Sequence, residues 1–381
     1  MRLLERGDLS DAGANGHGAS VAYVRDCIGA FGAKAIRNVR TEMHVLDTGR
    51  HTFPVSVNAG DEEPENSYVV SPLTAYSGYA RDELNRNDVG WFAAPLRLLT
   101  NVSGAWLSAA RIDRLVQVNN WLLSTNLYPS NWNGEDLEAI TALLTERWRD
   151  HAIGFRSLNA FSNPLLLEHL RLLGYVALPS RQVYIFDGRA GDDSSFSERH
   201  NLQIDMRLLR RGAYRVVREE LTSDADFERL EELYNLLYLD KYCRLNPQFT
   251  AAWLRCGQRD GWLELTTLRN ADGRIDGVAG WFAMGGIISA PIVGYDTGLP
   301  AKAGLYRMLT ALCIEEAARR RCVLNFSSGA AHFKRLRGGV PEIEYSMVYV
   351  RHLPARRRVV WHALAAASVA VAAPVLKAFR L

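Results

Sequence analysis

The side chains best suited to chemistry gather in the segment 325–339, NFSSGAAHFKRLRGG. This pattern is typical of a strand that leads through small residues into a short helix, a basic turn and a glycine pair. Transfer of a group to a nucleophile requires a base, a hydrogen-bond donor to the developing oxyanion, and an acid that protonates the leaving group. Such groups can converge where neighbouring predicted strands end. The candidate catalytic residues are Asn325, His332, Lys334 and Tyr295.

Two of these residues begin the predicted helix after the strand. His332 is the candidate base because imidazole titrates near neutral pH, and a solvated helix residue is the alternative interpretation. For Lys334 the alternative is an ordinary surface cation.

A second group of residues could bind a donor molecule that carries phosphate. The loop 296–304 precedes a helical run at 305–320, and helix N-termini present free N–H groups and partial positive charge to a phosphate. Lys302 would add a cation, whereas glycines placed for backbone reasons in an ordinary turn are the alternative. The candidate donor-binding residues are Asp296, Gly298, Lys302, Gly304, Ser327 and Ser328.

Amides and aromatic rings gather in the first half, at 116–132. Because buried amides need partners, they form either a satisfied turn network or one wall of an acceptor pocket. The candidate acceptor-binding residues are Asn119, Asn126, Tyr128 and, from the second half, Tyr242. Arg156 and Arg181 lie within apolar strands, where an unpaired charge is costly. Each therefore invites a carboxylate, from the protein or from a ligand.

The elements that must position these residues follow the same order twice: helix, strand, helix, glycine, strand. The predicted elements lie at 140–149, 151–158, 164–173 and 181–187, and again at 305–320, 322–328, 330–337 and 342–350. Further strands are predicted at 51–59, 65–71, 214–221, 263–270, 275–284 and 287–295. The last three strands are joined by hairpin signals, NADGR and a glycine pair. This favours an α/β (α+β) fold, a mixed sheet flanked by helices in each half, over a doubly wound Rossmann fold.

The polar, turn-rich start of the segment 187–211 predicts a boundary between two domains. The predicted organisation is a flexible tail at 1–20, an N-terminal domain at 21–190, a linker at 191–211, a C-terminal domain with the donor site at 212–352, and a C-terminal helix at 353–381.

Composition narrows the function classes. The 45 basic and 42 acidic residues give a net charge of +3, which argues against a uniformly basic face for nucleic acid. The 5 cysteines show no CxxC spacing, which indicates reduced thiols in a cytoplasmic protein, and no metal site is expected. The sequence lacks the motifs GxGxxG, GxxxxGK[ST], HExxH and GxSxG. It therefore does not support a dinucleotide-binding protein, a P-loop protein, a zinc protease or a serine hydrolase.

The C-terminal segment 359–376 is mostly apolar and has cationic flanks. This segment predicts a helix with three possible placements. In order of preference, the helix packs on the protein body, lies on a membrane surface, or spans a membrane. We expect weak, salt-sensitive contact with an anionic membrane. The predicted location is the cytoplasm. A further expectation is peripheral attachment to the inner face of the membrane.

Three stretches resemble the GNAT superfamily, in its double-domain FemAB-like branch. The first has Asn325, Phe326, Gly329, Phe333, Lys334 and Gly338 at the positions of that branch's strand, small-residue loop and Phe/Tyr–Lys pair. The second, 290–317, is similar to the fourth strand, donor loop and third helix. The third, 237–249, is similar to the acceptor-side helix and loop. The resemblance implies tandem GNAT-like domains and a C-terminal helix.

The resemblance also implies a function: N-acyl transfer from a thioester to an amine on a small or lipid-linked acceptor. The co-substrate would be coenzyme A or an acyl-carrier protein thioester, with no permanently bound cofactor. The loop GLPAKAG at 298–304 departs from the usual Gln/Arg-x-x-Gly-x-Gly/Ala pattern. This leaves open aminoacyl transfer from tRNA, or a catalytically silent scaffold that binds a partner. A tRNA would need a basic stripe, for which the clustered candidates are Arg207, Arg210, Arg211, Arg335 and Arg337.

Overall fold

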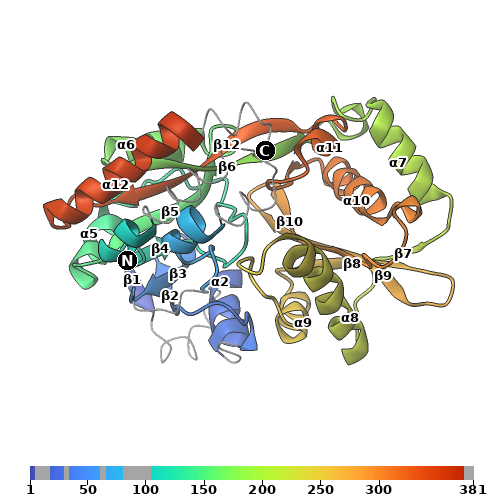
Figure 1. Cartoon of the computed structure of the whole chain (residues 1–381), viewed down its shortest axis with the longest axis horizontal. Coiled ribbons are helices and arrows are strands. Elements are labelled where there is room, and N and C mark those ends of the chain that lie inside the picture. The colour runs from blue at the N-terminus through green and yellow to red at the C-terminus, as the bar shows by residue number, and fades with distance from the viewer. Residues whose placement is uncertain (5–17, 30–33, 61–65, 80–103, 373–381) are drawn as a thin grey trace.

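The fold is built on one mixed sheet. The computed structural model describes residues 1–4, 18–29, 34–60, 66–79 and 104–372. In this part of the chain the strands form a 12-stranded sheet in the order β1-β2-β3-β4-β5-β12-β6-β11-β10-β9-β8-β7 (Figure 1). The strands are β1 (Arg2–Leu4), β2 (Glu42–Asp47), β3 (Thr52–Asn58), β4 (Leu115–Val118), β5 (Ala152–Asn159), β6 (Val176–Asp187), β7 (Arg215–Val217), β8 (Glu264–Arg269), β9 (Ile275–Met284), β10 (Ile287–Tyr295), β11 (Val323–Asn325) and β12 (Val340–Tyr349). The predicted fold class, a mixed sheet flanked by helices, is confirmed.

Helices cover both parts of this sheet. They are α2 (Gly18–Ala22), α5 (Leu137–Arg147), α6 (Pro164–Leu172), α7 (His200–Arg210), α8 (Asp224–Asn235), α9 (Ala251–Arg259), α10 (Leu305–Arg320), α11 (Ala331–Arg335) and α12 (Ala355–Ala367). The remaining helical segments are 3-10 or π helices: η1 (Tyr23–Gly29), η3 (Thr74–Tyr79), η5 (Gly191–Asp193), η6 (Leu236–Tyr242), η7 (Ala301–Ala303) and η8 (Ser368–Ala372). α10 is apolar on most of its surface because it is buried in the core of the C-terminal half, against the sheet and α7.

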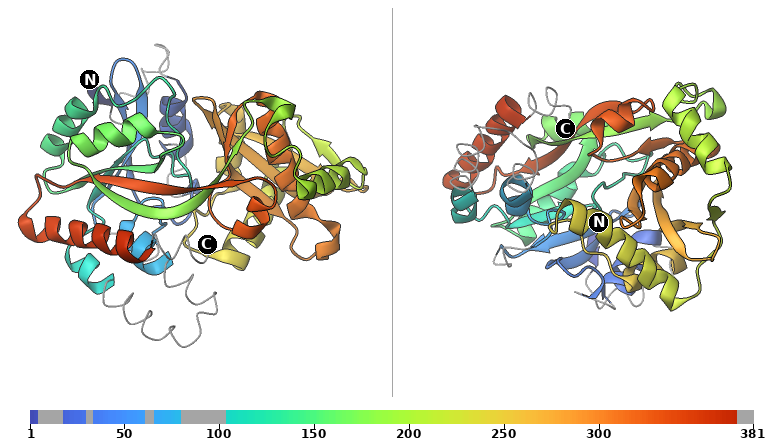
Figure 2. Two further views of the ribbon diagram at one scale, coloured as in Figure 1. Left: turned by 90° about the horizontal axis from the view of Figure 1, so that it is seen from above. Right: turned by 45° about the vertical axis from the view of Figure 1, so that its right-hand side comes forward.

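The two halves exchange strands at the centre of the sheet. β12, the last strand of the chain, lies between β5 and β6 of the first half and is antiparallel to both. β6 in turn pairs with β11 of the second half. Both strands are long, and the views in Figure 2 show them running side by side across the two parts of the molecule. The halves are therefore joined by a continuous hydrogen-bonded sheet as well as by the connecting segment.

Local turn chemistry predicted the meander of the second half correctly. β8, β9 and β10 pair in antiparallel hairpins, as the NADGR and glycine-pair signals indicate. The strand predicted at 65–71 is wrong, because residues 68–70 form a turn and residues 66, 67 and 71 have no regular structure; residue 65 lies outside the described residues. Val69 and Val70 are buried there without strand partners, and the amides of Asn58 and Gln117 donate to the Val70 carbonyl instead.

The segments predicted as tail and linker contain regular structure. Arg2–Leu4 pairs with β2 as an edge strand, and the buried Leu4 anchors it, whereas residues 5–17 of the predicted tail lie outside those described. In the segment 191–211, α7 packs along α10.

The C-terminal helix α12 packs on the first half of the chain. Val360, Trp361 and Ala365 are buried in a cluster with strand residues of the sheet. Arg357, one of the predicted cationic flank residues, is buried and donates to the carbonyls of Ala110 and Arg111. Among the described residues no helix is both long and apolar enough to cross a bilayer. Residues 373–381 lie outside those described, and the membrane contact stays a prediction.

Candidate active site

The sheet opens between β10 and β11. These strands pair in parallel only from Ile287 opposite Val323 to Ser289 opposite Asn325. β11 ends there, while β10 continues to Tyr295 with a register irregularity that contains Pro291. Proline lacks an N–H, so it suits a point where a strand leaves its neighbour. The buried Ser289 hydroxyl has no hydrogen-bond partner among the described residues.

The turn that follows β11 has an uncommon backbone. Ser327 and Ala330 have φ angles of 52° and 50°, in the left-handed region that costs a non-glycine residue on the order of 1 kcal/mol or more. The Asn325 side-chain oxygen accepts the Ser327 N–H at 3.1 Å. Backbone hydrogen bonds to Tyr184 on β6 hold Phe326 and Ser327. Several contacts thus fix a conformation that the chain would otherwise avoid.

Lys334 completes this turn. Its Nζ donates to the carbonyls of Phe326 at 2.6 Å, Ser328 at 2.8 Å and Ser327 at 3.3 Å, and the residue is 3% exposed. Burial lowers the pKa of Lys334 to about 7, and repulsion from Arg181 acts in the same direction, although the carbonyl acceptors favour the ammonium form. The interpretation of Lys334 as a surface cation is wrong, because the carbonyls of the turn draw the amine into the interior. The result is a buried amine that gains or loses its proton near neutral pH.

This titration makes stability depend on pH. Between about pH 7 and pH 10.5 an unfolded lysine holds its proton while folded Lys334 has released it, so the unfolded state binds more protons and stability rises with pH. We expect a rise on the order of 4 kcal/mol across this range, absent in Lys334→Met. Urea unfolding at several pH values measures it, with the exposed Lys34→Met as control. Equal slopes for Lys334→Met and wild type would contradict the expectation.

A buried carboxylate positions α11. Asp205 on α7 accepts from Arg307 on α10 at 2.6 Å and from Arg337 just after α11 at 2.5 Å. The Arg337 guanidinium also lies 3.3 Å from the centre of the Phe333 ring. Arg337 is therefore buried. It is one of the cations proposed above for a basic stripe that binds tRNA.

Aromatic side chains extend from α11 toward the end of β10. The Phe333 and Tyr306 ring centres lie 4.9 Å apart, and those of Tyr306 and Tyr295 lie 6.1 Å apart. On η6, Tyr238 and Tyr242 are 6.2 Å apart, and both interact electrostatically with the buried Tyr306 hydroxyl. Burial raises the pKa of Tyr306, so this hydroxyl stays protonated. The predicted residues Tyr295 and Tyr242 therefore belong to one aromatic cluster with Phe333, which precedes Lys334 in the chain.

The predicted donor loop has its own internal contacts. Gly304 has a φ of 72°, and a Cβ there would lie 2.5 Å from Leu208 of α7, so both the backbone and packing require glycine. The Asp296 carboxylate accepts the Gly298 N–H at 3.0 Å and pairs with Arg229 at 2.7 Å. Burial opposes its ionisation, but the hydrogen bonds from Arg229 and Gly298 keep the pKa of Asp296 below the ordinary value. Lys302 is exposed on η7.

The other predicted residues are arranged differently. Asn119 and Asn126 are buried, where they hydrogen-bond the Leu127 carbonyl and the Trp121 backbone and ring N–H groups. The Tyr128 hydroxyl donates to the Arg156 carbonyl at 2.7 Å. These contacts are those of the turn network, the alternative to an acceptor wall. His332 is exposed, and no described residue forms a hydrogen bond with its side chain.

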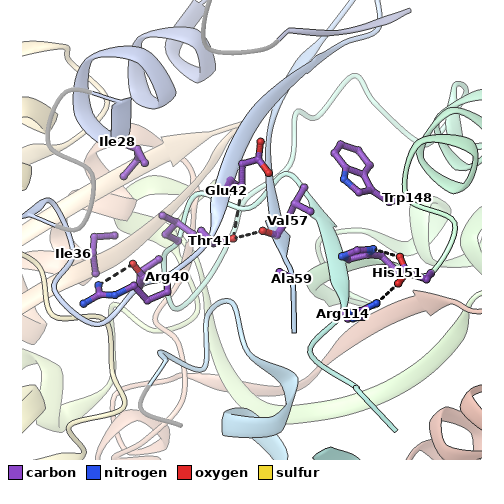
Figure 3. Close-up of a pocket in the computed structure, with 13 residues that line it drawn as sticks. Ile28, Ile36, Arg40, Thr41, Glu42, Val57, Ala59, Arg114, Trp148 and His151 are labelled. Atoms are coloured by element: carbon purple, nitrogen blue, oxygen red, sulfur yellow. Dashed lines mark hydrogen bonds and ion pairs between the residues drawn. The ribbon is translucent and has the colours of Figure 1, made fainter. Parts of the chain in front are cut away.

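A separate pocket of about 670 Å³ lies in the first half (Figure 3). Arg114 and His151 both reach the carboxylate of Asp150 in its wall, and Thr41 donates to the Val57 carbonyl. Burial lowers the pKa of His151 despite that carboxylate. Arg114 Nε and His151 Nε2 have no hydrogen-bond partner among the described residues. We assign the pocket no chemistry.

The fold is similar to that of FemX. FemX is 9% identical to this chain and superposes with a TM-score of 0.51 over 91% of this chain and 97% of FemX. The chain has a FemX-like fold. A tandem GNAT protein from the clavulanic acid biosynthesis pathway covers 89% of this chain and 91% of its own, at 11% identity and a TM-score of 0.40. L-PGS from Bacillus licheniformis covers 66% and 82%, at 14% identity and a TM-score of 0.44. The sequence matches no protein-family model and no curated protein.

The sequence does not indicate two further residues of the candidate site. Ser289 is a polar residue in the otherwise apolar stretch IISAPIVGY, and that contrast was its only signal. Cys313 on α10 is buried and lies close enough to Lys334 to interact electrostatically; burial raises the pKa of this thiol to about 12. A cysteine inside an apolar helix carries no distinguishing pattern.

Proposed function

We propose that the protein transfers an acyl group from a thioester donor, acyl-coenzyme A or an acyl-carrier protein, to an amine. The observation that carries this proposal is the buried amine of Lys334, with a pKa of about 7, at the point where β10 and β11 part. The tandem GNAT fold is consistent with it. The candidate centre consists of Lys334, Asn325, Ser289 and the aromatic cluster.

The residues suggest how the proton moves. The acceptor nitrogen forms a bond to the thioester carbon, and the carbon–sulfur bond breaks. Lys334 in its neutral form accepts the proton that leaves the nitrogen, and its ammonium form then gives that proton to the leaving thiolate. A pKa near neutral serves both transfers, because neither protonation state is strongly favoured.

Aminoacyl transfer from tRNA is a second candidate. Arg207, Arg210 and Arg211 are exposed together at the end of α7, where they could contact a phosphate backbone. This helix packs against α10, beside the candidate centre.

One experiment separates the two donors. Mass spectrometry of the purified protein would detect copurified coenzyme A, acyl-carrier protein or tRNA. Thiol release from a panel of acyl thioesters with amine acceptors would then measure transfer. Transfer from charged tRNA alone would favour the second candidate, and transfer from neither donor would reject both.

The donor loop provides a further prediction. Phosphates bound at 296–304 would lie near the exposed Lys302, so Lys302→Glu should lower coenzyme A affinity several-fold, as expected for reversal of one charge near a phosphate. Calorimetric titration with coenzyme A measures this, with Lys34→Glu as the charge-matched control. Unchanged affinity in Lys302→Glu would place the donor elsewhere.

A further inference from the structure

Two arginines and one carboxylate meet where β5, β12 and β6 run side by side. Arg181 on β6 binds Glu344 on β12 through Nε at 2.7 Å and Nη2 at 3.2 Å. Arg156 on β5 also interacts electrostatically with Glu344 and with Arg181. Arg181 in turn interacts with Lys334. This row of charges carries more cations than anions.

Arg156 lacks the partner that Arg181 has. Its Nη1 donates to the Val69 carbonyl at 2.9 Å and to the Asn120 side-chain oxygen at 3.3 Å, and both acceptors are neutral. No carboxylate forms an ion pair with it among the described residues. Glu344, the carboxylate that Arg156 interacts with, is hydrogen-bonded to Arg181 instead. A guanidinium that is largely withdrawn from water without an ion pair of its own is costly. Burial and the repulsion from Arg181 accordingly lower the pKa of Arg156.

The backbone supports this position of Arg156. The pairing of β5 with β12 is irregular between Phe155 and Leu158, and Ser157 has a left-handed φ of 64°. Such a bulge turns a side chain away from its regular direction and is common beside binding sites. A second irregularity, between β12 and β6, lies next to Arg181 and Glu344.

We propose that Arg156 binds an anionic group, a carboxylate or a phosphate, carried by the amine acceptor. The proposal rests on the proposed acyl transfer in one respect only, which is that the bound anion belongs to the amine acceptor. The anion would lie in the same row of charges as Lys334, with Arg181 and Glu344 between them. The acceptor class is therefore an amine that also bears an acidic group, and neutral or purely cationic amines would lack this contact.

Anion binding can be tested without knowing the acceptor. Inorganic phosphate and sodium acetate would be titrated into the full chain by calorimetry and thermal unfolding, with sodium chloride at equal ionic strength as reference. We expect at least one anion to bind and raise the unfolding temperature, and the two arms separate phosphate from carboxylate recognition. Arg156→Met should weaken this binding about tenfold or more, and Arg156→Lys should weaken it less. The exposed Arg189→Met serves as control and should respond like wild type.

The outcomes are distinct. In anion-free buffer Arg156→Met should unfold at the same temperature as wild type or higher, because it removes a largely buried charge that forms no ion pair. Failure of both anions to bind wild type, or an equal response in Arg156→Met, would overturn the proposal. So would strong destabilisation of Arg156→Met together with no anion response in wild type, which would indicate a structural tie to Val69. Lys334→Met should keep the anion response, so failure of the proposed catalysis would leave this result intact.

Discussion

Replacing Lys334 by methionine should lower the rate of acyl transfer by about 10²–10⁴-fold, the usual contribution of a positioned proton-transfer group. Methionine fills a similar volume but can neither accept the proton of the attacking amine nor return it to the thiolate. Thiol release measured with the donor and acceptor found for wild type gives the rate. Lys34→Met is the matched control, because Lys34 is exposed and belongs to the first half.

The pH profile provides the second readout. The neutral amine is the base, so kcat/KM should rise as pH increases through about 7 and reach a plateau above it. Lys334→Arg should be as inactive as Lys334→Met, since a guanidinium keeps its proton. Full turnover by folded Lys334→Met, or a wild-type profile that falls with pH through 7, would contradict the role of Lys334 as base.

Sequence reasoning succeeded where the deciding interactions are local. The hairpins of β8, β9 and β10 depend on turn residues next to each strand, and both could be predicted. The insertion of β12 between β5 and β6 could not. Its register joins residues such as Arg181 and Glu344, which are 163 positions apart, and no local pattern specifies such a pairing.

The same limit applies to the candidate site. The motif drew attention to Lys334, but in the basic turn HFKRLR this lysine resembles a surface residue. Its burial depends on three carbonyls that only the strained turn after β11 brings together. The sequence also leaves open which groups pair with Arg156 and Arg181, the two arginines within apolar strands. Glu344 forms an ion pair with Arg181, and among the described residues no carboxylate forms one with Arg156.

Asp205→Asn should have the largest effect on stability. The carboxylate is 1% exposed as a side chain and bonds two guanidiniums, so its loss leaves two cations around a neutral amide. Removing one partner of a buried ionic group typically costs about 3–5 kcal/mol. Urea unfolding measures this loss. Glu198→Gln, an exposed site just before α7, is the matched control and should stay within about 0.5 kcal/mol of wild type.

A combined variant distinguishes an uncompensated charge from lost packing. If the unpaired guanidiniums cause the destabilisation, Asp205→Leu with Arg307→Met and Arg337→Met should regain most of the stability, because apolar residues of similar size need no counter-charge. Transfer activity should not return with it. Arg337 contacts the Phe333 ring and Asp205 ties α11 to α7 and α10, so Lys334 would lose its fixed position even in a stable protein. A loss below about 1 kcal/mol in Asp205→Asn, or full activity in the triple variant, would show that this carboxylate does not position the site.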